Sequence, residues 1–387
     1  MGILTWNQHV VKKNNKALVL SLIIEKETIS RADIANVTGL NKTTVSSLVT
    51  ELLEDELIYE SGPGISSGGR RPVLLHFNRN TGYSIGVDIG VNYILSVLTD
   101  LKGKIIIEKS QSVNRTSYAA IISTVQTMIQ SLMDEMPDSR YGIVGIGVGV
   151  PGIVNKQGSV LLAPNLGWTN IQLKEDLEKI SNMPIIIENE ANAGAVGEQQ
   201  FGAGQDYENI LYVSAGIGIG VGIILNKELY RGKSGFSGEM GHMILEMNGK
   251  RCNCRSRGCW EAYASEHALL EMAGENIDSL ESLIDYAKNG EKSAIELFEK
   301  IGQYLGFGIN NIINTFNPDQ VIIGNRLALI REWIEEPIRK TIENHTLAYH
   351  QKEMHLEFSM LGKYSTALGM SAFVVDNFIK AGEIQNC

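Results

Sequence analysis

The chain has 387 residues, of which 43% are hydrophobic and 20% are charged, and its formal net charge is −10. This length allows two or three domains with a large core. No apolar run is long enough to cross a membrane, and the first residues lack the apolar core of a signal peptide. These features exclude a membrane span, and we expect a soluble, cytoplasmic protein.

The charge is spread unevenly along the chain. Residues 1–80 hold nine Lys and Arg against eight Asp and Glu, a net charge of +1, whereas the remaining residues carry −11. Acidic surfaces repel the phosphates of nucleic acids. We therefore expect only this N-terminal part, the head, to meet a polyanion.

Three helices are predicted in the head. The first covers residues 9–25, and the second starts at Ser30, which forms a capping-box arrangement with Asp33. A turn at Gly39, a residue free to take a positive φ, leads to a third helix capped by Asn41. The apolar residues of the third helix recur at the spacing of one buried face: Val45, Leu48, Val49, Leu52 and Leu53.

The opposite face of this third helix offers short polar side chains. A helix, a glycine turn and a second helix with a polar N-terminal face are typical of a helix-turn-helix, whose second helix enters the major groove of DNA. The residues of these helices that we expect to contact DNA are Arg31, Asn41, Lys42, Thr43, Thr44, Ser46 and Ser47.

Two predicted strands, residues 57–61 and 73–77, enclose the glycine-rich run 62–69. This pattern predicts a β-hairpin wing with Arg70 and Arg71 near its tip, and an arginine there can enter the narrow minor groove of A·T-rich DNA. The alternative is a small helical protein-interaction module with a disordered loop. We interpret the head as a winged helix-turn-helix domain that binds DNA.

Beyond residue 81 the pattern changes to α/β. Three apolar strands within 84–110, a helix at 117–136 and a strand within 142–152 are followed by a similar series from residue 209 to residue 325. This repetition predicts two homologous lobes, and the cleft between such lobes can bury a small ligand when they close. The glycine-rich turns at 88–90 and 214–220 fit phosphate loops and tight hairpins equally well.

The densest pattern of the chain is the sequence between residues 237 and 261. Its three cysteines lie within eight residues, and a histidine precedes them by ten. Zn²⁺ takes thiolate and imidazole ligands tetrahedrally, and four protein ligands make a structural site. Reduced thiols without a metal are the alternative, whereas a disulfide is disfavoured because Cys-x-Cys closes too small a ring. We predict one structural Zn²⁺ per chain, held by His242, Cys252, Cys254 and Cys259.

Carboxylates and carboxamides gather at four places in the body: residues 151–152, 164–168 and 188–192, and Glu239 and Glu261 beside the predicted metal. Such groups suit a polyhydroxylated ligand, because each hydroxyl can donate to a carboxylate and accept from an amide or a histidine. For any one of these residues, a role as a helix cap or in a surface loop is the alternative. Their joint occurrence favours a sugar site.

These motifs together resemble the ROK family, named for repressors, open reading frames and kinases. The zinc signature is Gly238-Glu239-Met240-Gly241-His242 followed by Cys252-x-Cys254-x4-Cys259-x-Glu261, and the head with Gly69-Arg70-Arg71-Pro72 is similar to that of the repressor branch. The resemblance covers essentially the whole chain. It implies an α+β protein in which a winged helix-turn-helix domain (1–80) precedes an actin-like, ribonuclease H-like body. The expected lobes are 81–190, with a C-terminal helix at 366–387 packing back on it, and 191–365.

Carried over by position, the sugar contacts are Asn165, Asn189, Glu190, Glu239, His242 and Glu261, and Gly152 joins them from the loop after a buried strand. The family's kinases have an aspartate base where this chain has Glu190, a second glycine at Val91, a threonine at Ala215 and a glycine cluster at Gly324-Asn325. A glutamate base would lie about 1.5 Å too far along its side chain, and such a misplacement costs about 100-fold in rate. The departures imply that nucleotide binding is lost while sugar binding remains.

The resemblance thus implies a homodimeric repressor without enzymatic activity. It would bind operator DNA of a xylose-utilisation operon and be released by xylose or a related aldose. Two alternatives remain. One is a ROK-type sugar kinase that carries a DNA-binding domain, and the other is an activator or architectural DNA protein whose body only dimerises.

Overall fold

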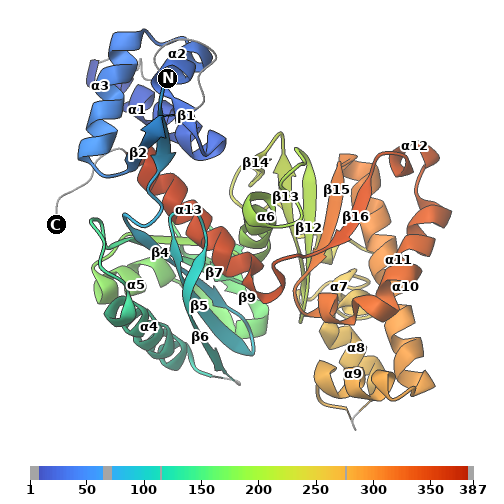
Figure 1. Cartoon of the computed structure of the whole chain (residues 1–387). Coiled ribbons are helices and arrows are strands. Elements are labelled where there is room, and N and C mark those ends of the chain that lie inside the picture. The colour runs from blue at the N-terminus through green and yellow to red at the C-terminus, as the bar shows by residue number, and fades with distance from the viewer. Residues whose placement is uncertain (1–7, 64–71, 114–115, 275–276, 382–387) are drawn as a thin grey trace.

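The computed structural model describes residues 8–63, 72–113, 116–274 and 277–381. A head stands on the first of two α/β lobes, and the second lobe lies beside the first (Figure 1). The predicted fold class, a winged helix-turn-helix followed by a two-lobed α/β body, is confirmed. Within the described ranges, no helix combines the length and the apolar character needed to cross a membrane.

The predicted caps of the head helices are confirmed. The Ser30 hydroxyl accepts a hydrogen bond from the Asp33 amide (3.2 Å), Gly39 has a φ of 70°, and Asn41 Oδ1 accepts from the Thr44 amide (2.7 Å). The strands pair in the order β1-β3-β2. The elements of the head are α1 (Gln8–Lys26), β1 (Ile29–Ser30), α2 (Arg31–Thr38), α3 (Lys42–Glu54), β2 (Ile58–Pro63) and β3 (Val73–Phe77).

The first lobe is built on a sheet with the strand order β11-β7-β4-β5-β6. Side chains of α4 and α5 cover one face of this sheet, and the C-terminal helix α13 covers the other. A separate small sheet with the order β10-β9-β8 also belongs to this lobe. The bounds are β4 (Tyr83–Ile89), β5 (Tyr93–Asp100), β6 (Ile105–Ser112), α4 (Tyr118–Glu135), β7 (Ile143–Val150), β8 (Ile153–Val154), β9 (Val160–Ala163), η1 (Pro164–Leu166), β10 (Trp168–Ile171), α5 (Leu173–Ser181) and β11 (Ile185–Asn189).

The second lobe repeats this topology, with the order β16-β15-β12-β13-β14. In both sheets the first strand of the lobe is antiparallel to the second and parallel to the fourth, so the predicted internal repeat is confirmed. The sequence pattern missed the fifth strands, β11 and β16, and it predicted a third strand over residues 227–232, which is longer than β14. The strands are β12 (Ile210–Ala215), β13 (Ile219–Leu225), β14 (Glu228–Leu229), β15 (Gln320–Gly324) and β16 (His355–Phe358).

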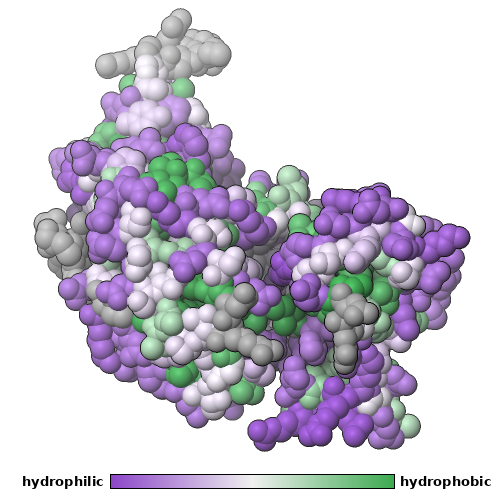
Figure 2. All heavy atoms as spheres, turned by 90° about the horizontal axis from the view of Figure 1, so that it is seen from below, coloured by the Kyte–Doolittle hydropathy of each residue, from purple (hydrophilic) through white to green (hydrophobic). Residues whose placement is uncertain are grey.

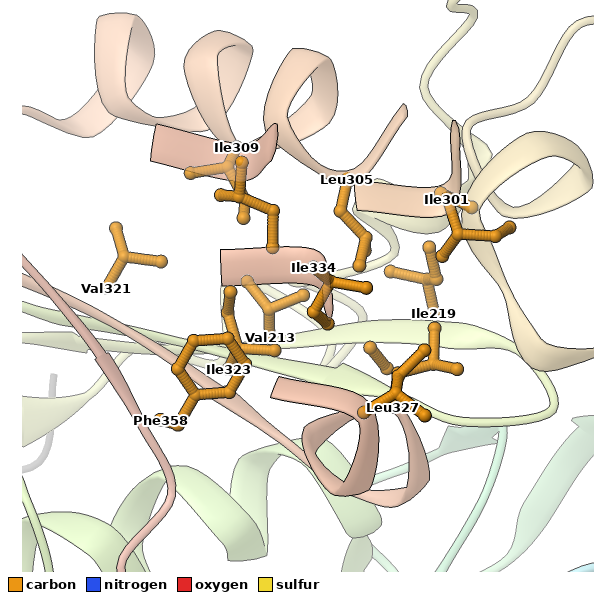
Figure 3. Packing of buried hydrophobic residues seen from close by; sticks show 14 of the residues in the cluster. Val213, Ile219, Ile301, Leu305, Ile309, Val321, Ile323, Leu327, Ile334 and Phe358 are labelled. Atoms are coloured by element: carbon orange, nitrogen blue, oxygen red, sulfur yellow. The ribbon is translucent and has the colours of Figure 1, made fainter. Parts of the chain in front are cut away.

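Helices α10 and α11 cover the second sheet and form an apolar core with it, in which Ile309 and Leu305 of α10 face Val213 and Ile323 of the sheet (Figure 3). Burial of this many aliphatic side chains is the main favourable contribution to folding. The helices of this part are α6 (Glu190–Phe201), η2 (Met240–His242), α7 (Glu261–Ala264), α8 (Glu266–Ala273), α9 (Leu280–Lys288), α10 (Lys292–Phe316), η3 (Arg326–Ile330), α11 (Arg331–His345), α12 (Ala348–Gln351) and η4 (Gly362–Tyr364).

The last helix, α13 (Ser365–Ala381), joins the lobes to the head (Figure 1). Its first half lies so close to its neighbours that a Cβ on Gly86 of β4 would come within 1.9 Å of the carbonyl oxygen of Ala367. Its second half ends in the head, where Val375, Phe378 and Ile379 pack against the head core. The C-terminal helix therefore completes a domain that begins at the other end of the chain.

Polar contacts reinforce the docking of the head on the first lobe. Two glutamates of the head with left-handed backbones, Glu27 (φ 57°) and Glu56 (φ 56°), pair with Lys102 (3.0 Å) and Arg140 (2.7 Å) of the lobe. The neighbouring Tyr141 hydroxyl donates to a head carbonyl at 2.7 Å. Exposed ion pairs contribute little, so most of this interface rests on apolar contacts, from α13 and from Leu101, Tyr141 and Val144 of the first lobe.

Candidate functional site

A cavity of about 280 Å³ lies between the two lobes. Seen from below, the surface is hollowed where the lobes meet (Figure 2). The structure brings together all seven residues that the sequence nominated for sugar binding, and each of them lines this cavity: Gly152, Asn165, Asn189, Glu190, Glu239, His242 and Glu261. They come from both lobes, so a ligand bound here would touch both.

The first lobe contributes the turn between β11 and α6. Asn189 is the N-cap of α6, and its Oδ1 accepts from the amides of Ala191 (2.9 Å) and Asn192 (3.1 Å). Its Nδ2 donates to the carbonyl of Gly152, the glycine that follows β7 (2.9 Å). The helix-cap alternative therefore applies to Asn189, and a ligand hydroxyl can use only the remaining N–H of its carboxamide.

Glu190 lies deep in the crevice beside a second acid, Asp88. Its Oε1 accepts a hydrogen bond from the Ser214 hydroxyl of the second lobe (3.1 Å). Withdrawal from water and the negative charge of Asp88 raise the pKa of Glu190 to about 8. Burial raises the pKa of Asp88 to about 7, although the hydrogen bond from Tyr93 lowers it. Near neutral pH these carboxyls can both donate and accept hydrogen bonds, as a hydroxylated ligand requires.

The second lobe contributes two more carboxylates. Glu261 opens α7, and its Oε2 accepts from the Ile219 amide (3.0 Å), which fixes the carboxylate at the cavity wall. Glu239 precedes η2, and its Oε2 lies 3.8 Å from His242 Nε2. The pKa of Glu239 is raised, mainly because the carboxyl is buried. One ring nitrogen of His242 thus faces the cavity side of the site.

The other ring nitrogen faces the cysteines. His242 Nδ1 lies 3.7 Å from Cys252 Sγ, and the sulfurs of Cys254 and Cys259 are also 3.7 Å apart. The four ligand atoms lie within 4.8 Å of one another. A tetrahedral ion with metal–sulfur bonds of about 2.3 Å requires edges of roughly 3.8 Å between its ligands, so this cluster fits a metal ion. The three cysteines are free rather than disulfide-bonded.

The cluster is anchored to the core of the second lobe. Trp260, next to Cys259, is fully buried, and its indole N–H donates to the carbonyl of Tyr304 on α10 (2.9 Å). Gly308 of the same helix leaves room for this indole, since a Cβ there would lie 1.9 Å from the ring. A bound ion would therefore tie η2 and α7, which carry the cavity carboxylates, to one rigid helix.

Sequence reasoning missed one residue at the floor of the crevice, Tyr93. Its hydroxyl donates to Asp88 Oδ2 at 2.6 Å, and its ring fills the space beside Gly90, where a Cβ would meet it at 2.4 Å. On the facing side, Asn325 Nδ2 donates to the Ser214 hydroxyl (3.0 Å). No sequence signal marks Tyr93, because an aromatic residue at the start of a strand is ordinary.

The polar face of α3 is open to solvent. Asn41, Lys42, Thr43, Ser46 and Ser47 are exposed. The remaining helical candidates are less free, since Thr44 is half-buried and Arg31 forms an ion pair with Glu60 of β2 (2.7 Å). Arg70 and Arg71, the predicted wing-tip residues, lie outside the described residues.

Both parts of the chain match models of known protein families. Residues 84–377 match the model of the ROK family, and residues 15–59 match a winged helix-turn-helix DNA-binding model. A xylose repressor of Bacillus spizizenii is 44% identical over 375 residues, which cover 96% of this chain and 98% of that protein.

Two solved structures share the fold. A ROK family transcriptional regulator, described as a homolog of the E. coli MLC protein, superposes with a TM-score of 0.82 at 26% identity over 96% of this chain and 98% of that one. A ROK family glucokinase from Streptomyces griseus, in complex with glucose and AMPPNP, gives 0.70 at 27% identity over 76% of this chain and 99% of that one. The expected actin-like body is confirmed by these matches.

Proposed function

The chain belongs to the ROK family, and on this premise we propose that it is a transcriptional repressor that a sugar releases from its operator. The observation that carries the proposal is the union of two parts in one chain: a DNA-reading head and a crevice lined by seven polar residues of both lobes. The relative from Bacillus spizizenii, named a xylose repressor, supports D-xylose or a related aldose as inducer and a xylose-utilisation operon as target. Such a repressor works in the cytoplasm, where its operator lies.

The seven crevice residues are the proposed sugar contacts. Glu239 and Glu261 of the second lobe face Asn189 and Glu190 of the first. The carboxylates accept hydrogen bonds from ligand hydroxyls, and the free N–H of the Asn189 carboxamide donates one, which suits the hydroxyls of an aldose ring. Because the contacts belong to both lobes, binding favours the closed arrangement by the free energy of the contacts that only closure completes.

We propose one structural Zn²⁺ per chain at His242, Cys252, Cys254 and Cys259. The support is geometric, since the 3.7 Å edges of the cluster fit a tetrahedral ion. Four protein ligands leave no open position, so the ion does no chemistry on the sugar. Its role is to hold η2 and α7 in the positions from which their carboxylates reach the crevice.

We propose further that the chain does not phosphorylate its sugar. Tyr93 and Asn325 occupy the space beside two glycine turns of the crevice, at Gly90 and Gly216. The phenol of Tyr93, hydrogen-bonded to Asp88, takes up space where triphosphate oxygens would have to enter. Glu190, longer than the aspartate base of the kinases, adds a second obstacle.

The proposed signal is a change in the separation of two heads in a homodimer. We divide the chain into 1–80, 81–190 with α13, and 191–365. The end of α13 ties the head to the first lobe, and Phe373 of the same helix also packs against the second lobe. If the second lobes form the dimer contact, closure of each crevice rotates the heads relative to each other. Heads that read successive major grooves must stay about 34 Å apart, so such a rotation weakens operator binding.

Helix α3 and the wing are the proposed DNA contacts. Thr43, Ser46 and Ser47 present donors and acceptors at the N-terminal end of α3, the part that reaches base edges in this fold, and Lys42 presents a cation to the phosphate backbone. Asn41, Thr44, Arg31 and the wing arginines Arg70 and Arg71 complete the proposed set, with the wing expected on the phosphate backbone and in the minor groove.

Fluorescence anisotropy tests the proposal. An operator selected by this protein from random duplex DNA is titrated with and without D-xylose, L-arabinose and D-glucose. We expect one aldose to weaken binding by at least tenfold; a full reversal from 99:1 to 1:99 needs about 10⁴. Operator binding that ignores every aldose would contradict the inducer assignment.

Two measurements separate the alternatives. A kinase carrying a DNA-binding head would release ADP when ATP and xylose or glucose are supplied, and Glu190→Gln would abolish this turnover. An architectural protein would bind DNA but give no heat with any aldose in titration calorimetry. The proposed repressor gives sugar heat and no turnover.

A further inference from the structure

A loop of the second lobe crosses onto the first. The bridging loop, residues 230–238, follows β14 and ends directly before Glu239. Its glycines Gly232, Gly235 and Gly238 all have positive φ values, of 66°, 93° and 93°. At its middle, a Cβ on Gly235 would lie 3.2 Å from the carbonyl oxygen of Val154, on β8 of the first lobe. The loop therefore spans the junction of the lobes next to the crevice.

Arg231 of this loop forms an ion pair with the first lobe. Its Nε donates to Glu188 Oε2 at 2.7 Å, and the Glu188 side chain is only 11% exposed. The other carboxylate oxygen, Oε1, accepts from the Asn189 amide (2.9 Å) and from Asn192 Nδ2 (3.0 Å). Glu188 therefore holds the turn that presents Asn189 and Glu190 to the crevice, and Arg231 supplies the cation that balances it.

The same guanidinium also touches the helix that enters the head. Its central carbon lies 5.2 Å from the ring centroid of Phe373 on α13. Five residues farther along α13, Phe378 packs against the core of the head. Arg231, fixed in the second lobe, thus contacts both the turn that carries the crevice residues and the helix on which the head is docked.

We propose that Arg231 is a positioning residue that couples sugar occupancy of the crevice to the orientation of the head. This inference rests on the proposed function and adds the route by which the second lobe acts on the head. When the lobes move relative to each other, the Arg231–Glu188 pair must shift or break, because its two partners belong to different lobes. A shift of this ion pair displaces the β11–α6 turn, and it also displaces α13 through the contact of Arg231 with Phe373.

A planar guanidinium suits this position better than an ammonium. It can donate to a carboxylate while its face stacks on an aromatic ring, whereas a lysine keeps the charge but loses the stack. Arg231→Lys should therefore keep part of the coupling and Arg231→Ala should lose most of it. If Arg231 had only a packing role, its variants would lose stability while the coupling stayed unchanged.

The experiment compares the full-length wild type with Arg231→Ala, Arg231→Lys, Glu188→Gln and the Ala/Gln double variant. The matched control is Lys233→Ala, which removes an exposed cation from the same loop. Calorimetry gives the dissociation constant for D-xylose, and anisotropy gives the operator dissociation constant with and without saturating D-xylose. Melting temperature and zinc content report on general damage.

We expect Arg231→Ala to bind the operator without sugar as the wild type does, within about threefold. The fold-change that saturating xylose produces in operator affinity should fall about tenfold, and the affinity for xylose should fall about tenfold as well, the loss expected for a partly buried hydrogen bond between charges. Arg231→Lys should lie between the two, and Lys233→Ala should match the wild type. The double variant should be no worse than the weaker single variant, since both substitutions remove one interaction.

The outcomes separate a failure of the proposed function from a failure of the coupling role of Arg231. A wild-type protein whose operator binding ignores every aldose would overturn the proposed function, and this inference with it. A wild-type response that persists in full in Arg231→Ala would overturn this inference alone. A fall in melting temperature or zinc content with the response intact would assign Arg231 a merely structural role and overturn the inference too.

Discussion

The phenol of Tyr93 and the carboxyl of Asp88 form a 2.6 Å hydrogen bond at the floor of the crevice. Asp88 is only 3% exposed, so this donor replaces water that the carboxyl has lost. The Tyr93 ring at the same time fills the space beside Gly90. One side chain therefore both satisfies a buried acid and fills space at the floor of the crevice.

Removing this donor should destabilise the protein. Tyr93→Phe leaves a buried carboxyl without its partner, and we expect the free energy of unfolding to fall by about 1–3 kcal/mol. Urea titration followed by fluorescence measures the change. The control is Tyr118→Phe, because the Tyr118 hydroxyl donates to Asp176 (2.8 Å) at a half-buried site near the surface of the same lobe. Equal losses in the two variants would contradict the role given to Tyr93.

Stability should depend on pH through Glu190. Its pKa of about 8 lies above the ordinary 4.5, so the folded state binds this proton more tightly than the unfolded state does. The stability gained is complete below the ordinary value and is lost as pH rises through the folded-state value. We expect the melting temperature of the sugar-free protein to fall as pH rises from about 4.5 to about 8, and to fall less in Glu190→Gln. Glu25→Gln, at an exposed site, should follow the wild type in a scanning-fluorimetry pH series.

Loss of the proposed Zn²⁺ should affect the sugar response before DNA binding. Cys254→Ser removes one of four ligands, and we expect the purified variant to lose its zinc and its xylose affinity to fall by at least about tenfold. Operator affinity without sugar should change by less than about threefold, because the head is docked on the other lobe. Mass spectrometry of the metal and calorimetry give the two values. Cys387→Ser, at the end of the chain, is the control. Zinc retained in Cys254→Ser would contradict the assignment of Cys254 as a metal ligand.

The docking of the head should depend on Phe378. Its ring packs edge-on against Tyr141 of the first lobe, with centroids 5.4 Å apart, and lines the head core. Phe378→Ala should cost about 2 kcal/mol, less than a fully buried Phe because the side chain is only partly covered. Operator affinity should fall while xylose affinity stays within about twofold. Asn377→Ala, at the exposed neighbour, should leave both unchanged.

Lys42 should contribute affinity without specificity. As an exposed cation at the N-terminal end of α3, it is placed to contact a phosphate. Lys42→Ala should weaken operator and random DNA alike and should lower the slope of log affinity against log salt concentration by about one. Lys13→Ala, on α1, is the control. A slope unchanged in Lys42→Ala would show that this side chain does not meet the backbone.

The sequence predicted most of what is local. Caps such as Ser30 and Asn41 act within three residues, and the strands of each lobe repeat in order, so both could be found from spacing alone. The crevice residues followed from motif positions. The contacts of Tyr93 with Asp88 and of Arg231 with Glu188 could not be predicted, because no periodicity marks a pair that depends on tertiary packing. The same holds for α13, whose apolar residues predict a buried helix but not that part of it completes the head.

That completion limits how the protein can be re-engineered. A biosensor built by exchanging residues 1–80 for the reading domain of another repressor would leave the new domain against the old Val375, Phe378 and Ile379. Shape and volume would no longer match at this seam, and the graft would be loose or misaligned. An exchange of the DNA-binding domain must therefore replace the last turns of α13 together with residues 1–80.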